Sequence, residues 1–155
     1  MTLRSALTLR GTLELSDPKA KRTMGGFAQF VTANAETLQK FFGHKLFPGS
    51  LNVLVAHPPS LQQDLDAGLP APIFVLPRNE LEGMPVYIGD GQAWACNLNG
   101  EKFPSAIGCW IFRRIRSNVP RGVIEIVAVE PLVGPYKLQH GDEVSIEVFT
   151  PGAAD

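Results

Sequence analysis

Apolar and polar residues alternate near the start of the chain, where leucines at positions 7, 9, 13 and 15 are separated by polar or charged residues. A period of two is typical of a β-strand with one face in water. Further short apolar runs bounded by turn residues predict strands at 51–55, 73–76, 86–88, 93–98, 107–115, 123–129 and 144–149. Turns are expected at 89–91 and 97–100. Many short strands with hairpin signals predict a mainly β fold with a closed barrel.

Two short helices are expected between these strands. The first covers residues 34–42, because Asn34 is a suitable N-cap and Gly43 a suitable C-terminal residue. The second begins near Ser60. The apolar residues at 27–31, just before the first helix, are expected to form a strand or a bend. The prediction is therefore a mainly β protein with short helices.

Length and composition indicate one domain over residues 1–155. The 14 Lys and Arg residues nearly balance the 15 Asp and Glu residues, so no positive field draws the chain to nucleic acid. No apolar run has the length needed to span a bilayer, and no signal peptide is recognisable. Cys96 and Cys109 lie in apolar stretches and are expected to be buried thiols rather than a disulfide. A reducing cytoplasm is the expected location.

The segment from Phe47 to Val53 is the strongest candidate for chemistry. An extended backbone places Ser50 and Asn52 on one face and the intervening apolar side chains on the other. Hydroxyl and amide oxygens are hard ligands that suit Mg²⁺, and Gly49 allows a ligand to approach the backbone closely. The alternative is a turn in which both side chains satisfy nearby backbone groups.

Pro48-Gly49-Ser50-Leu51-Asn52-Val53 resembles the Pro-Gly-Thr-Leu-Asn-Val signature of the CTP-dependent riboflavin kinases. Residues 123–128 and 138–146 resemble later strands of that family, in the same order along the chain. The resemblance implies a closed six-stranded cradle-loop barrel that phosphorylates riboflavin to FMN, with Mg²⁺ as cofactor and CTP as phosphate donor. It also implies that Ser50 and Asn52 bind the metal, because they match the family's threonine and asparagine.

The first loop departs from the family's Gly-x-Gly-x-Gly pattern. Residues 17–26 contain a basic cluster followed by two glycines, so Lys19, Lys21, Gly25 and Gly26 are the candidate phosphate contacts, together with Gly49. The alternative is a basic surface loop that is simply solvated. A second departure is the segment 113–121, which lacks the histidine of the family's Arg-Thr-x-His sequence.

Glu125 lies in the predicted strand 123–129, on the opposite face from Ile124 and Ile126. If that face lines a cleft, Glu125 could deprotonate a substrate hydroxyl as a general base. The alternative is a strand residue that faces solvent.

The sequence therefore predicts a kinase that uses riboflavin and a nucleotide, and it does not indicate an oligomeric state. A non-catalytic or differently specific barrel that binds a small phosphorylated or flavin-like ligand is the alternative function. A third hypothesis is an interaction module that pairs with partners through its strand edges. It is supported only by the β content.

Overall fold

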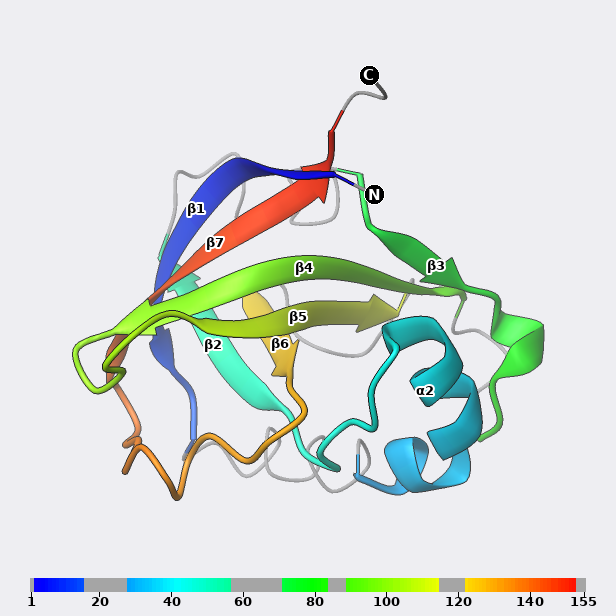
Figure 1. Cartoon of the computed structure of the whole chain (residues 1–155). Helices are drawn as coiled ribbons and strands as arrows, with labels where there is room; N and C mark the ends of the chain where they lie inside the picture. Colours follow the sequence, from blue (N-terminus) through cyan, green and yellow to red (C-terminus); the bar gives the residue numbers. More distant parts are fainter. Residues whose placement is uncertain (1, 16–27, 57–70, 84–88, 115–121, 153–155) are drawn as a thin grey trace.

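The computed structural model describes residues 2–15, 28–56, 71–83, 89–114 and 122–152, and most of them form one antiparallel sheet (Figure 1). Within these ranges the sheet has seven strands: β1 (Leu3–Leu13), β2 (Leu51–Ala56), β3 (Phe74–Leu76), β4 (Gly91–Gly100), β5 (Ile107–Arg114), β6 (Val123–Val127) and β7 (Glu143–Pro151). The prediction of a mainly β fold with short helices is confirmed. The predicted strand 86–88 and the helix near Ser60 lie outside the described residues.

The sheet closes into a ring. Its strand order is β3-β4-β5-β6-β2-β1-β7, and β4 also pairs with β7. Strand β4 changes partner along its length, since it pairs with β3 near Gly91 and with β7 from Cys96 to Gly100. Strands β1 and β7 form the longest pairing, with a register shift between Ser5 and Leu7. The first and last described residues lie together, because the Gly152 amide donates to the Thr2 carbonyl at 2.7 Å.

The predicted turn at 97–100 is wrong, because these residues complete β4. Asn99 is opposite Ser145 of β7, and Gly100 is opposite Val144. Pairing with β7 therefore outweighs the local turn preference of the sequence Asn-Leu-Asn-Gly. The chain turns immediately afterwards, where the amide of Phe103 donates to the carbonyl of Gly100 at 3.1 Å.

The helical region next to the ring consists of residues 28–33 and helix α2 (Ala35–Phe42). The expectation of a strand or bend at 27–31 is wrong for 28–31, which are helical. The two apolar residues there, Phe30 and Val31, are buried against α2 and β5 rather than in the sheet. Helix α2 ends as predicted, with Gly43 in the left-handed conformation at φ 76°. No helix in the described ranges is both long and apolar enough to cross a membrane.

Asn34 precedes α2 as predicted, but its side chain does not cap the helix. Its Oδ1 accepts the Glu82 amide hydrogen at 2.7 Å, and its Nδ2 donates to the Glu82 carbonyl at 3.0 Å. Nδ2 also donates to the Phe30 carbonyl at 2.9 Å. Asn34 therefore fastens the helical region to the segment that follows the short 3₁₀-helix η1 (Arg78–Glu80).

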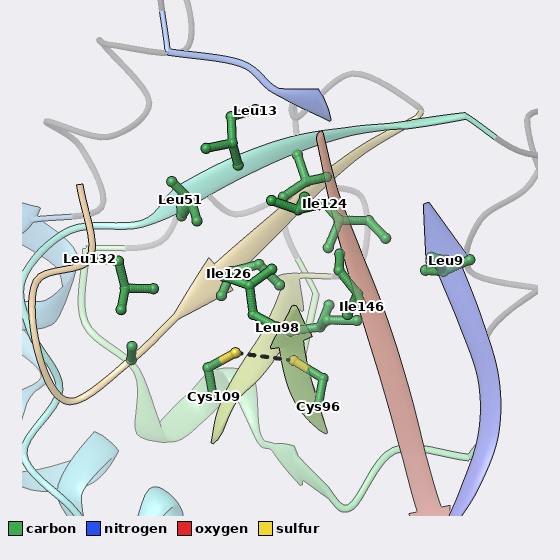
Figure 2. Packing of buried hydrophobic residues seen from close by; sticks show 14 of the residues in the cluster. Leu9, Leu13, Leu51, Cys96, Leu98, Cys109, Ile124, Ile126, Leu132 and Ile146 are labelled. Carbon is green, nitrogen blue, oxygen red and sulfur yellow. Dashed lines mark hydrogen bonds between the residues drawn. The ribbon is translucent and has the colours of Figure 1, made fainter. Parts of the chain in front are cut away.

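Two apolar clusters flank the sheet. The larger fills the inside of the ring and contains Cys96 and Cys109, which are directly opposite in β4 and β5 (Figure 2). Their sulfur atoms are 3.5 Å apart and both thiols are free, as predicted. The smaller cluster lies outside the ring under α2, where the ring of Phe42 meets the edges of Phe74 and Trp110.

Candidate functional site

Asn52 lies in β2, directly opposite Glu125 of β6, and Ser50 immediately precedes β2. Alternation along both strands places these three side chains on one face. Directly opposed residues in an antiparallel pair have Cβ atoms about 5 Å apart. The other face of each strand carries the apolar side chains that anchor it inside the ring, namely Leu51, Val53, Ile124 and Ile126. The sheet thus brings Asn52 and Glu125 together, and Ser50 lies two residues before Asn52.

All three side chains are buried, with exposed fractions of 4% for Ser50, 2% for Asn52 and 4% for Glu125. Ser50 Oγ, Asn52 Oδ1 and Glu125 Oε1 have no hydrogen-bond partner among the described residues. Ser50 Oγ and Asn52 Oδ1 therefore do not satisfy backbone groups of the described residues, as the alternative turn would require. A buried polar atom without a partner costs about 1–3 kcal/mol, so three together indicate a site that a ligand completes.

These atoms fit a hard divalent cation. A hydroxyl, an amide oxygen and a carboxylate are the oxygen ligands that Mg²⁺ accepts, usually together with water and nucleotide phosphates. The backbone at Asn52 is held in place, because its carbonyl accepts the amide hydrogen of Glu14 at 2.9 Å. The side chain of Asn52 therefore projects from a strand whose backbone is hydrogen-bonded on both sides, to β6 and to the end of β1.

Burial raises the pKa of the Glu125 carboxyl above its ordinary value, and the positive charges of Arg114 and Arg113 partly oppose that shift. Both arginines come from the end of β5. Arg113 donates to the Val123 carbonyl at 3.4 Å, and the Arg114 guanidinium lies 5.4 Å from the centre of the Phe30 ring. A carboxylate whose pKa is raised by burial holds a proton more readily, as a general base requires. The alternative of a solvent-facing Glu125 is wrong.

A cavity of about 370 Å³ is lined by Ser50 and by Leu51 and Ile126, whose side chains lie on the opposite strand face from Asn52 and Glu125. Its wall is almost entirely apolar, and Ser50 lies in it, whereas Asn52 and Glu125 do not. Three segments form the wall: Leu15 after β1, the chain before and at the start of β2, and the chain that leaves β6. The last two are joined where the Phe47 amide donates to the Ala128 carbonyl at 2.8 Å. The described lining residues are Leu15, Phe47, Gly49, Ser50, Leu51, Ile126, Ala128, Glu130, Pro131, Leu132, Val133 and Gly134.

Comparison with known proteins identifies the family. The model of the CTP-dependent riboflavin kinases, described as a domain of unknown function (DUF120), matches residues 23–148. The chain belongs to this riboflavin kinase family. The matched range includes Ser50, Asn52 and Glu125 and most of the cavity wall, but it begins after Lys19 and Lys21.

Several archaeal riboflavin kinases are similar to this family member. It is 30% identical over 124 residues to a riboflavin kinase of Methanospirillum hungatei, an alignment that covers 80% of this chain and 52% of the relative. It is 26% identical over 114 residues to the Sulfolobus acidocaldarius riboflavin kinase, covering 74% and 67% of the two chains. The Sulfurisphaera tokodaii riboflavin kinase is 29% identical over 114 residues, covering 74% and 78%. The chain thus spans about half the length of the Methanospirillum relative.

Gly49 lies in the wall of the cavity, where it makes room for an aromatic ring of this same chain. Its amide donates to the Phe47 carbonyl at 2.8 Å. A Cβ at Gly49 would come within 2.9 Å of the Phe47 ring. The absence of a side chain at Gly49 therefore leaves room for the ring of Phe47. The other predicted phosphate contacts, Lys19, Lys21, Gly25 and Gly26, lie outside the described residues.

Sequence reasoning missed the part of the cavity wall formed by Leu15 and residues 130–134. The available signal was weak: two apolar residues, Val129 and Val133, remain exposed on either side of a proline after β6. Exposed apolar side chains at the rim of a hollow are typical of ligand sites.

Proposed function

We propose that this protein transfers the terminal phosphate of CTP to riboflavin, giving FMN and CDP. The observation that carries the proposal is a set of three buried oxygens with no hydrogen-bond partner among the described residues: those of Asn52 and Glu125, which are opposite each other in β2 and β6, and that of Ser50 just before β2. Membership of the family and the similarity to archaeal riboflavin kinases supply the substrates. The ring formed when β4 pairs with β7 supports the further proposal that the fold is the family's six-stranded cradle-loop barrel.

In this mechanism Ser50 Oγ and Asn52 Oδ1 would hold Mg²⁺, which would neutralise phosphate charge. The terminal hydroxyl oxygen of the ribityl chain attacks the γ-phosphorus as the bond from that phosphorus to the β–γ bridging oxygen breaks. CDP leaves with the electron pair of the broken bond. Glu125 accepts the hydroxyl proton. Positioning and charge neutralisation provide most of the acceleration in such transfers, so few catalytic side chains suffice.

We also propose that the apolar cavity receives the base and sugar of the nucleotide, because it adjoins Ser50 and has ample volume for a small planar ring. Gly49 and Ser50 both line the cavity, so the phosphates of a nucleotide bound there would pass beside them. Lys19, Lys21, Gly25 and Gly26 belong to the same proposal as contacts of the nucleotide phosphates. Their basic and glycine-rich sequence supports this role.

The test combines product analysis with binding. Purified protein is incubated with riboflavin, MgCl₂ and each nucleoside triphosphate in turn, and FMN is measured by chromatography. CTP with Mg²⁺ is titrated calorimetrically into the wild type and into a Ser50→Ala, Asn52→Ala double variant. We expect FMN with CTP, and we expect the double variant to lose at least a hundredfold in activity together with most of its Mg²⁺-dependent CTP binding. Its thermal stability should not fall, because the removed oxygens are unpaired.

A matched control replaces a serine and an asparagine elsewhere in the ring. Asn99 and Ser145 are directly opposite in β4 and β7 and lie outside the cavity wall. The Asn99→Ala, Ser145→Ala variant should retain CTP binding and activity. Saturating wild-type protein that makes no FMN from any nucleoside triphosphate would overturn the proposal in favour of a binding protein without kinase activity.

A further inference from the structure

The backbone at the end of β1 is held from two sides just before it forms the cavity wall. The Leu13 amide donates to the Asp142 carbonyl at 2.9 Å, and the Gly141 amide donates back to the Leu13 carbonyl at 2.8 Å. On the other side, the Glu14 amide donates to the Asn52 carbonyl at 2.9 Å. The same segment thus contacts both the turn at 139–142 and the strand that carries Asn52.

The next amide, that of Leu15, is bound by a side chain. It donates to His140 Nδ1 at 3.2 Å, so the imidazole takes the place of a carbonyl where regular pairing with the turn has ended. The side chain of Leu15 then enters the cavity wall together with Ser50 and Leu51. His140 itself does not line the cavity.

We infer that His140 is a positioning residue for the cavity: its neutral imidazole accepts the Leu15 amide hydrogen and so holds Leu15 in the wall beside Ser50. The consequence for nucleotide affinity rests on the proposed function. The hydrogen bond itself does not, and it can be tested separately.

The imidazole has a second partner that competes for the same nitrogen. Glu14 Oε1 lies 3.4 Å from His140 Nδ1. The unprotonated Nδ1 can accept from the Leu15 amide, whereas a protonated Nδ1 can only donate, and the carboxylate of Glu14 is then the available acceptor. The two contacts are therefore alternatives for the same nitrogen.

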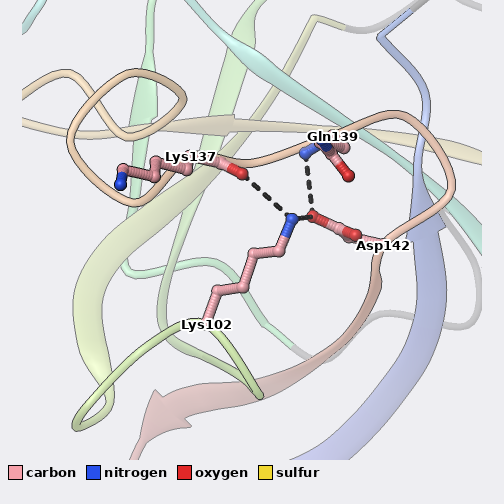
Figure 3. Close-up of polar contacts among 4 residues, drawn as sticks. All are labelled: Lys102, Lys137, Gln139 and Asp142. Atoms are coloured by element: carbon pink, nitrogen blue, oxygen red, sulfur yellow. Dashed lines mark hydrogen bonds and ion pairs between the residues drawn. The ribbon is translucent and has the colours of Figure 1, made fainter.

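Other charged groups on this turn are already engaged. The Asp142 carboxylate binds Lys102 Nζ at 2.7 Å and accepts the Gln139 amide hydrogen at 2.8 Å, while Lys102 also donates to the Lys137 carbonyl (Figure 3). The hydrogen bond from Lys102 and the one from the Gln139 amide lower the pKa of Asp142, so this carboxylate stays charged and bound to Lys102 rather than to the imidazole.

The experiment compares His140→Ala with His140→Asn, since the Asn Oδ1 can accept a hydrogen bond where Nδ1 did but cannot take up a proton. Hydrogen exchange of the Leu15 amide is measured by NMR, and KM and kcat are measured with CTP. In His140→Ala we expect about fivefold faster exchange at Leu15, the effect of losing one hydrogen bond. We also expect a raised KM for CTP at nearly unchanged kcat. His140→Asn should restore both values.

Lys102→Met is the matched control, because it removes the ion pair with Asp142 from the same turn and leaves the Leu15 contact in place. It should leave Leu15 exchange and KM unchanged.

Equal Leu15 exchange in the wild type and His140→Ala would overturn the inference, as would a Lys102→Met variant with the same defect as His140→Ala. If the wild type makes no FMN, the kinase proposal fails while the exchange measurement still decides the role of His140.

Discussion

The carboxylate form of Glu125 is unfavourable in the folded protein. It is buried opposite Asn52, and burial raises its folded-state pKa above the ordinary value. The carboxylate form is therefore less favourable in the folded protein than in the unfolded chain. The resulting penalty is present above the folded-state pKa and disappears as the pH falls below the unfolded-state value.

Glu125→Gln should consequently stabilise the fold while abolishing phosphoryl transfer. We expect a gain of about 1 kcal/mol in the free energy of unfolding at neutral pH, the scale of a buried polar group without a partner. The gain should vanish at acidic pH, where the wild-type carboxyl is protonated. Urea unfolding at the two pH values measures this, with the exposed Glu143→Gln as control. A Glu125→Gln variant that is less stable at neutral pH would contradict the expectation.

The local pattern around β2 and β6 predicted that Asn52 and Glu125 lie on the faces opposite their apolar neighbours, because alternation decides which side chains share a face, but the choice of Ser50, Asn52 and Glu125 as candidates also needed the family resemblance. It was not sufficient for Leu15 and residues 130–134, which reach the cavity through the path of the whole chain. Asn34 shows the same limit: its position before a helix was predictable, but its partner Glu82 lies 48 residues away. Long-range partners leave no local signal.

Strands β1 and β2 approach each other unusually closely at one residue. Gly11 is opposite Val55, and a Cβ at Gly11 would collide with the backbone carbonyl of Leu54 and come within 2.9 Å of Val53 Cγ1. A carbonyl in a sheet cannot move aside without breaking the pairing. The glycine is therefore a requirement of this pairing rather than of a turn.

Gly11→Ala should lower the free energy of unfolding by about 3 kcal/mol, in the range of severe overpacking. Gly134→Ala is the control, since a Cβ there meets no atom within 4 Å among the described residues. Thermal or urea unfolding of both variants measures the difference. Two variants of equal stability would show that β1 and β2 are not in this register.

Closure of the ring protects the interior of the protein. Strand β4 is paired with β5 along its length and with β7 at its end, so Cys96 has a neighbouring strand on either side. The hydrogen bond with the Cys109 thiol, together with burial, raises the pKa of Cys96 well above its ordinary value. The thiolate is the reactive form of cysteine. Burial hides Cys96 from reagents, and its raised pKa keeps it in the thiol form, so both oppose modification of the native protein.

Both thiols should therefore remain unreactive toward a chromophoric disulfide reagent in the native protein and react together once denaturant unfolds it. The rate should follow global unfolding rather than local opening. Stopped-flow measurement across a urea series tests this, with free cysteine as the reference for the intrinsic rate. Reaction of a single thiol at a rate near that of free cysteine in native buffer would contradict it.

The hydrogen bond between Gly152 and Thr2 joins the first and last described residues at the far end of β1 from Leu15 (Figure 1). Eleven residues of extended strand lie between, a span of about 35 Å. An affinity tag or a fused domain at either end would therefore emerge away from the cavity and leave its mouth open to small molecules.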